Sequence, residues 1–128
     1  MVKMLLGCCV ALLSLSTVAV LAHHSVAGQF DSSKPVELSG TISDVDWINP
    51  HVYIHLDVKD DKGAVTPWRL ETLPTAMLRK AGLTKDMIIA GGMAVTVTGI
   101  SARDGTKNLA WAQKLTYADG HYYQLAGE

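Results

Sequence analysis

The sequence predicts an all-β protein, a small OB-like antiparallel β-barrel of about five to six strands with one short helix between strands three and four. Apolar and polar residues alternate in several short segments, turn-forming residues separate these segments, and one stretch alone has helical spacing. A simple antiparallel sandwich would show the same alternation, so it remains the alternative.

The N-terminal 22 residues have the pattern of a secretory signal peptide. Lys3 supplies a positive charge, residues 5–20 are almost entirely apolar, and small or neutral residues lead up to Ala22. A retained membrane anchor is less favoured, because about 20 apolar residues are needed to span a bilayer and polar residues follow at once. We therefore expect residues 1–22 to be removed and the protein to be periplasmic or secreted in a bacterium, without a stable membrane anchor.

Cleavage after Ala22 would leave 106 of the 128 residues, enough for one domain with a modest core. This mature chain would have no cysteine and therefore no disulfide, thiolate chemistry or Cys-type zinc site. It would carry a formal charge of −2 with neutral histidines, and it has no basic run, so nucleic acid is not expected as a partner.

Residues 23–35 lack periodicity and are expected to form an N-terminal arm, with the barrel domain over residues 36–128. The first strand alternates over residues 36–42, and its apolar positions then change phase towards Val45, as at a bulge near Gly40. The second strand follows Asn49-Pro50. Four of its residues are expected to face the core and four the other side: Val52, Ile54, Leu56 and Val58 inward; His51, Tyr53, His55 and Asp57 outward.

A turn at residues 60–63 leads to the third strand, residues 65–71, with Trp68 and Leu70 facing the core. The predicted helix covers residues 74–81, with Met77, Leu78 and Ala81 on one face and Gly82 as its end. The last elements are a fourth strand from Ala94, a fifth at residues 109–117 and a short closing segment at residues 121–125.

Two histidine motifs give the chain a family resemblance. The His23-His24-Ser25 sequence and the Trp47-Ile48-Asn49-Pro50-His51 sequence resemble a family of small exported bacterial proteins of unknown function, marked by an AHHS-type and an NPH motif. The resemblance implies export and a compact β domain, and it implies no activity.

Cleavage after Ala22 would also place a free α-amine and an imidazole on one residue, His23. Together with the imidazole of His51, these groups would form a histidine brace, a T-shaped set of three nitrogens that suits copper(II). His24 is a competing third ligand, although adjacent residues in an extended arm direct their rings apart. The predicted metal ligands are thus His23, His51 and His24.

The remaining ligands of the site are not determined by the sequence. His55 lies about 13 Å from His51 along the strand, too far to share one ion easily. A further ligand position is open to four side chains, which the sequence does not separate: Asp31, Asp57, Glu71 and His121. Each histidine can equally be a structural hydrogen-bonding residue.

The sequence therefore predicts an exported copper-binding protein first, with a metal ion and another periplasmic protein as partners. A metal-free OB-like binding or interaction module is the alternative. An enzyme comes third, because no Ser-His-acid set, carboxylate pair or phosphate loop is evident.

Overall fold

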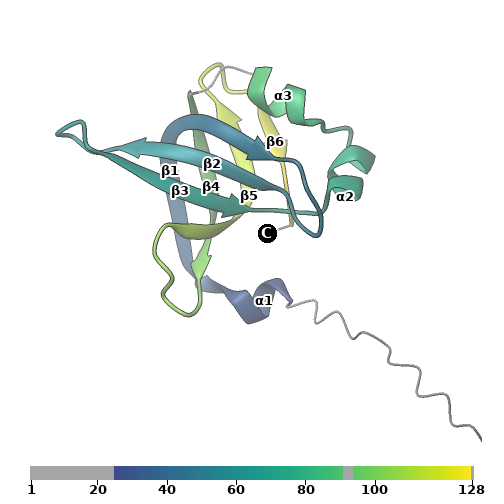
Figure 1. Ribbon diagram of the computed structural model, residues 1–128, viewed down its shortest axis with the longest axis horizontal. Coiled ribbons are helices and arrows are strands. Elements are labelled where there is room, and N and C mark those ends of the chain that lie inside the picture. Colours follow the sequence, from purple (N-terminus) through teal and green to yellow (C-terminus); the bar gives the residue numbers. More distant parts are fainter. Residues whose placement is uncertain (1–24, 91–93, 128) are drawn as a thin grey trace, which may run out of the picture.

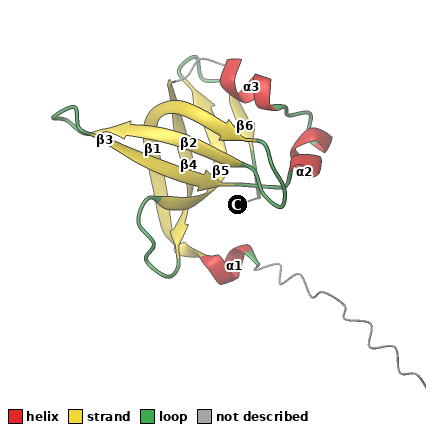
Figure 2. Ribbon diagram, viewed as in Figure 1, coloured by secondary structure: helices red, strands yellow, loops and turns green. Residues whose placement is uncertain are grey.

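The structure is a computed structural model that describes residues 25–90 and 94–127. Over these residues the chain forms six strands and three short helices (Figures 1 and 2). In chain order they are α1 (Val26–Gln29), β1 (Phe30–Asp46), β2 (Tyr53–Lys59), β3 (Val65–Glu71), α2 (Thr75–Lys80), α3 (Lys85–Ala90), β4 (Ala94–Ala102), β5 (Leu109–Tyr117) and β6 (Tyr122–Gln124).

The strands form one sheet in the order β3-β2-β1-β4-β5-β6. Neighbours in this order are antiparallel, and a further, parallel pairing joins β3 to β5. This pairing links the two ends of the series β3-β2-β1-β4-β5 into a ring, and Figure 1 shows how strongly β1 bends to accommodate it. The all-β prediction is confirmed.

The core lies inside this ring, and the predicted phase of β2 is confirmed. Val52, Ile54 and Leu56 are fully buried, whereas Tyr53 and His55 on the opposite face are partly exposed. Leu70 of β3 is also fully buried. Burial of these aliphatic side chains supplies the main driving force for folding.

The predicted bulge in β1 is confirmed by a register shift between Ile42 and Asp44. At Gly40 the backbone of β2 approaches so closely that a Cβ atom would lie 2.4 Å from the Asp57 carbonyl oxygen. Gly40 is thus required at this bend, because any side chain would collide with the neighbouring strand.

The first strand begins six residues before its predicted start. Phe30 is buried and pairs with Ala102, and Pro35 pairs with Ile100 after a register shift, so residues 30–35 belong to the sheet rather than to an arm. Residues 31–34 are all polar, so the sequence shows no alternation with apolar residues that would identify this part of the strand.

The prediction of a single helix is wrong. Helix α2 lies where expected, but only Thr75 and Leu78 are buried, and Met77 is 53% exposed because so short a helix presents one narrow row of side chains to the core. Helix α3 was missed, although the Thr84 hydroxyl accepts a hydrogen bond from the Met87 amide, which is a recognisable N-terminal cap.

Candidate functional site

His51 lies just before β2, where the β2–β3 hairpin ends. The register pairs Tyr53 with Glu71, and hydrogen bonds from Val52 N to Leu73 O and from Thr72 N to Val52 O extend the pairing one step further. These bonds hold the backbone of residue 51 beside the end of β3. His51 Nδ1 consequently reaches Glu71 Oε1 and forms a hydrogen bond with it.

The Glu71 carboxylate is nearly buried, with 7% of its side chain exposed against 21% for His51. Trp111, which pairs with Glu71 across the β3–β5 contact, presents its ring at 80° to the imidazole, with centroids 5.7 Å apart. The ring of Phe30 lies behind Trp111 at 5.8 Å. Glu71 and Trp111 therefore both contact the His51 ring, and Phe30 packs on Trp111.

This contact also determines which imidazole nitrogen is available. A carboxylate can only accept a hydrogen bond, so Nδ1 of His51 donates to Glu71, and in the neutral imidazole the lone pair then lies on Nε2. Histidines that bind metals usually donate their other ring N–H to a carboxylate or carbonyl in this way. His51 thus has the hydrogen bonding of a metal ligand.

Tyr53 pairs with Glu71 across the β2–β3 hairpin. Burial and the nearby Glu71 carboxylate raise the pKa of the Tyr53 phenol, and the positive charge of Arg69 opposes them. The Arg69 guanidinium carbon lies 4.5 Å from the centroid of the Tyr53 ring. Glu71 is therefore shared between a histidine and a tyrosine.

His55 has a different environment on the same strand. Its Nε2 lies 2.7 Å from Asp46 Oδ2, and both side chains are substantially exposed. The structure thus assigns His51 and His55 to separate carboxylates and does not bring them together at one site.

His121 forms a third, local pair. Its Nδ1 contacts the exposed Asp119 carboxylate two residues earlier, and its ring stacks on Tyr117 at 4.3 Å. Hydrogen bonds from the backbone and side chain of His121 lower the pKa of Asp119. Burial raises the pKa of Tyr117 to about 12, and its hydroxyl donates to the Ile88 carbonyl at 2.5 Å. The stacking of His121 on Tyr117 was not predicted.

Of the four side chains left open as further ligands, Glu71 is the one in contact with His51. Asp31 instead accepts hydrogen bonds from Ser33, and Asp57 lines a different pocket. Across residues 25–90 and 94–127 no three histidine, cysteine or acidic side chains gather closely enough to hold a metal. His23 and His24 lie outside the described residues.

Two pockets include residues next to His51: Glu71 lines one and Trp111 lines the other. One, of about 380 Å³, is lined by Gly28, Gln29, Tyr53 and Glu71 among others. The other, of about 400 Å³, is more apolar and includes Val26, Phe30, Leu73 and Trp111. Residues of α1 line both pockets.

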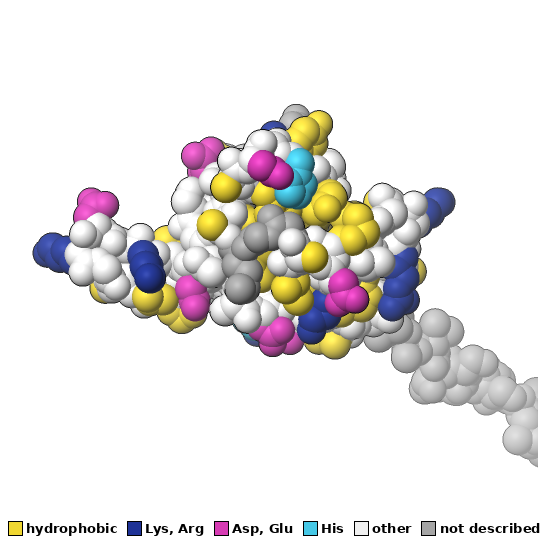
Figure 3. All heavy atoms as spheres, turned by 90° about the horizontal axis from the view of Figure 1, so that it is seen from above, with side chains coloured by type: hydrophobic (Ala, Val, Ile, Leu, Met, Phe, Trp, Pro, Cys, Tyr) yellow, Lys and Arg dark blue, Asp and Glu magenta, His cyan; other side chains and the backbone are white. Residues whose placement is uncertain are grey.

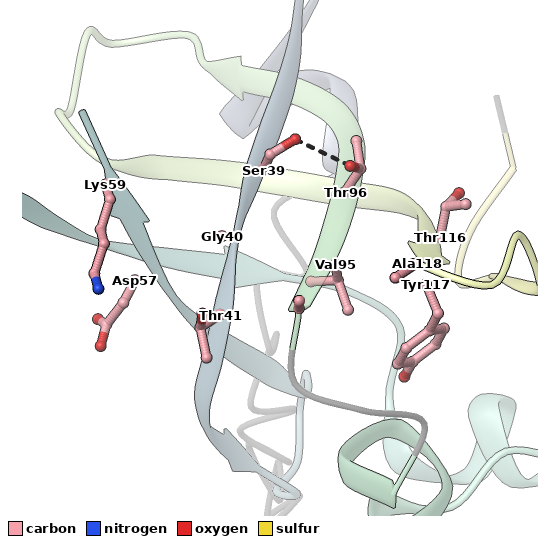
Figure 4. Close-up of a pocket in the computed structure, with 11 residues that line it drawn as sticks. Ser39, Gly40, Thr41, Asp57, Lys59, Val95, Thr96, Thr116, Tyr117 and Ala118 are labelled. Carbon is pink, nitrogen blue, oxygen red and sulfur yellow. Dashed lines mark hydrogen bonds between the residues drawn. The ribbon is translucent and has the colours of Figure 1, made fainter. Parts of the chain in front are cut away.

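A third pocket, of about 430 Å³, lies between β1, β2, β4 and β5 (Figure 4). The Ser39 and Thr96 hydroxyls form a 3.0 Å hydrogen bond at its wall. The described residues that line it include no histidine, so this pocket is separate from the candidate site. On the face seen in Figure 3, acidic, basic and hydrophobic side chains are interspersed, without a continuous patch of one charge.

None of the helices in the described residues is long and apolar enough to cross a membrane. No curated protein and no solved structure matches the chain. A model of a family of unknown function, DUF6152, matches residues 11–110, which include the whole of β1 to β4 as well as His51 and His55. The match covers most of the 128 residues, and the chain belongs to this family.

Proposed function

We propose that the protein is exported to the periplasm, loses residues 1–22, and binds copper through a histidine brace. The ligands are the His23 amine, the His23 imidazole and the His51 imidazole, with His24 as the competing third ligand. We further propose that the ring of strands is an OB-like barrel, which provides a rigid support for His51.

The hydrogen bond between His51 Nδ1 and the buried Glu71 carboxylate carries this proposal. It fixes the orientation of the imidazole and, in the neutral ring, leaves the Nε2 lone pair to bind a metal, as the outer carboxylate does in metal sites. Trp111 restrains the ring further, at 5.7 Å between centroids. An exposed structural histidine would need neither restraint.

The choice of copper rests on the donor set. Three nitrogens, one of them an amine, favour copper(II) over the other divalent first-row metals and suit its tetragonal geometry. When bound, the metal would be held by His23 and His51, while Glu71 would position His51 without contacting the ion.

The alternative is a metal-free binding module. The pocket of about 400 Å³ supports it, because Phe30, Leu73 and Trp111 give it an apolar wall of the kind that small molecules occupy. In that case the His51–Glu71 pair would serve only to hold the end of the β2–β3 hairpin.

The test uses protein recovered from its exported form, with the N-terminus established by intact mass. Copper and zinc content are measured, and copper(II) is then titrated into the wild type, His51→Ala and a form with one alanine added before His23. We expect at least a tenfold loss of copper affinity in both variants, about 1.4 kcal/mol. Electron paramagnetic resonance should count three coordinating nitrogens in the wild type.

His55→Ala is the matched control, because His55 also pairs with a carboxylate on this strand face but lies away from Glu71. It should leave copper affinity unchanged. Unchanged affinity after the N-terminal extension would exclude the brace, and a mature chain that starts before His23 would favour the metal-free module.

A further inference from the structure

We propose that the pocket walled by Phe30, Leu73 and Trp111 binds a small molecule with an apolar body and one carboxylate, and that Arg103 holds the carboxylate. This inference rests on the alternative function given above, the metal-free binding module, and adds the class of its ligand and the residue that selects it. It does not depend on copper binding.

The apolar wall of the pocket is a hydrophobic cluster distinct from the main core. The rings of Phe30 and Trp111 pack there with centroids 5.8 Å apart. Val26 and Leu73 pack against this cluster and remain partly exposed, so they present apolar surface to the pocket. The pocket volume of about 400 Å³ suits a small molecule, whose apolar body would be removed from water on this wall.

Arg103 is the only charged residue among the described residues that line the pocket. Its guanidinium is held in place, because Nε donates to Ala27 O at 3.1 Å and Nη2 donates to Phe30 O at 3.2 Å. Arg103 also lines the more polar pocket of about 380 Å³, so the cation lies where an apolar pocket meets a polar one. Charge complementarity therefore favours a ligand that is apolar at one end and anionic at the other.

Asp31 does not use up the hydrogen-bonding capacity of Arg103. The Asp31 carboxylate lies 3.9 Å from Nη1, beyond hydrogen-bond distance, and accepts instead from Ser33 N at 3.1 Å and Ser33 Oγ at 2.7 Å. Lys34 Nζ lies 3.6 Å from the same carboxylate and offsets its charge. A guanidinium has more N–H groups than the two that the Ala27 and Phe30 carbonyls accept, so it can also donate to a ligand carboxylate.

Hydrogen bonds hold both sides of the pocket before a ligand binds. On one side, Gln113 Nε2 donates to Gly127 O at 3.0 Å, and Ala126 N donates to Gln113 O at 3.1 Å. On the other side, Arg103 holds the carbonyl of Ala27. Such preorganisation lowers the cost of ordering the protein around a ligand.

The test uses two fluorescent probes with the same ring system. Anilinonaphthalene sulfonate carries an anionic group, which stands in for the carboxylate, and N-phenylnaphthylamine lacks it. Each probe is titrated into protein recovered from its exported form, with a metal chelator present so that copper cannot contribute. Decanoic acid and decanol then compete for the site of the anionic probe.

Two substitutions, each with a matched control, separate the charge from the cavity. Arg103→Gln removes the cation, and Lys107→Gln removes a charge from the same β4–β5 connection at a residue that does not line the pocket. Ser32→Trp places an indole at the pocket wall, and Ser43→Trp makes the same change on β1 away from it. Circular dichroism establishes that each variant keeps its fold.

We expect the wild type to bind the anionic probe at least tenfold more tightly than the neutral probe, and decanoic acid to displace it at lower concentrations than decanol. Arg103→Gln should bind the anionic probe at least tenfold more weakly and the neutral probe as the wild type does. Ser32→Trp should weaken the binding of both probes at least tenfold. Lys107→Gln and Ser43→Trp should match the wild type.

Three results would overturn the proposal. An unchanged preference for the anionic probe in Arg103→Gln, or an equal loss of both probes, would mean that Arg103 does not hold the anion. Unchanged binding in Ser32→Trp would mean that the probes bind elsewhere. If the wild type binds both probes equally, the binding module stands and its selection of an anion is wrong, whereas binding of neither probe would count against the module itself.

Discussion

His51, just before β2, and His55, within β2, lie on the same face, and each pairs with one carboxylate. The two pairs differ in the nitrogen used and in the burial of the carboxylate. His51 uses Nδ1 and reaches across the hairpin to Glu71, whose side chain is 7% exposed. His55 uses Nε2 and reaches Asp46, whose side chain is 43% exposed. The first ring is also restrained by Trp111.

The difference shows that a His–carboxylate pair does not by itself indicate a site. An exposed pair contributes little, because water solvates both groups and competes for their hydrogen bonds. Water has little access to a nearly buried carboxylate, so its hydrogen bond fixes the orientation of the histidine that contacts it. Of these two pairs, only that of His51 combines a nearly buried carboxylate with an aromatic ring against the imidazole.

The largest effect on the free energy of unfolding is expected in the core, beneath the strand face that carries both histidines. Ile54 is fully buried between them in sequence, and Ile54→Ala should reduce the free energy of unfolding by about 2–5 kcal/mol in chemical denaturation. Tyr53→Ala should cost less, because Tyr53 is partly exposed. Equal losses would contradict the assignment of the two faces.

A smaller effect on the free energy of unfolding should distinguish the two His–carboxylate pairs directly. Glu71→Ala leaves His51 without its partner in a poorly solvated place and should cost about 1–3 kcal/mol of unfolding free energy. Asp46→Ala should cost less than about 0.5 kcal/mol, because His55 can turn to water. A double-mutant cycle with the matching histidine substitution measures each coupling, and similar couplings would remove the distinction.

Much of the fold was predictable from local pattern. The alternation in β2, the bulge after Ile42 and the Asp60–Gly63 turn all depend on neighbouring residues, and the structure has them as expected. The start of β1 was not predictable in this way. Phe30 is included because it pairs with Ala102, a contact between residues far apart in sequence.

The candidate site was likewise predictable only where it depends on residues close in sequence. His51 was identified from its place after Asn49-Pro50, and the hairpin turn offered a route to Glu71, because counting back from the turn places Tyr53 opposite Glu71. Trp111 had no such signal. It reaches His51 through the parallel β3–β5 pairing, which no local pattern encodes.

The smallest effect concerns the pKa of Tyr53, which responds to the charge of the Glu71 carboxylate paired with it. Burial is the main cause of the raised pKa of Tyr53, and the Glu71 carboxylate is the second. Glu71→Gln should therefore lower the Tyr53 pKa while leaving it above the ordinary value of 10.0, and Asp46→Asn should leave it unchanged. Nuclear magnetic resonance of ring-labelled tyrosine follows the titration.

The same shift makes stability depend on pH. A raised pKa in the folded state means that the unfolded chain loses the Tyr53 proton first, so this contribution to stability is complete below pH 10 and is lost as the pH rises through the folded pKa. Glu71→Gln should lose less stability over that range than the wild type, and Asp46→Asn should lose the same amount. An identical alkaline loss in all three proteins would mean that Glu71 does not act on Tyr53, and the distinction between the two carboxylates would then rest on His51 alone.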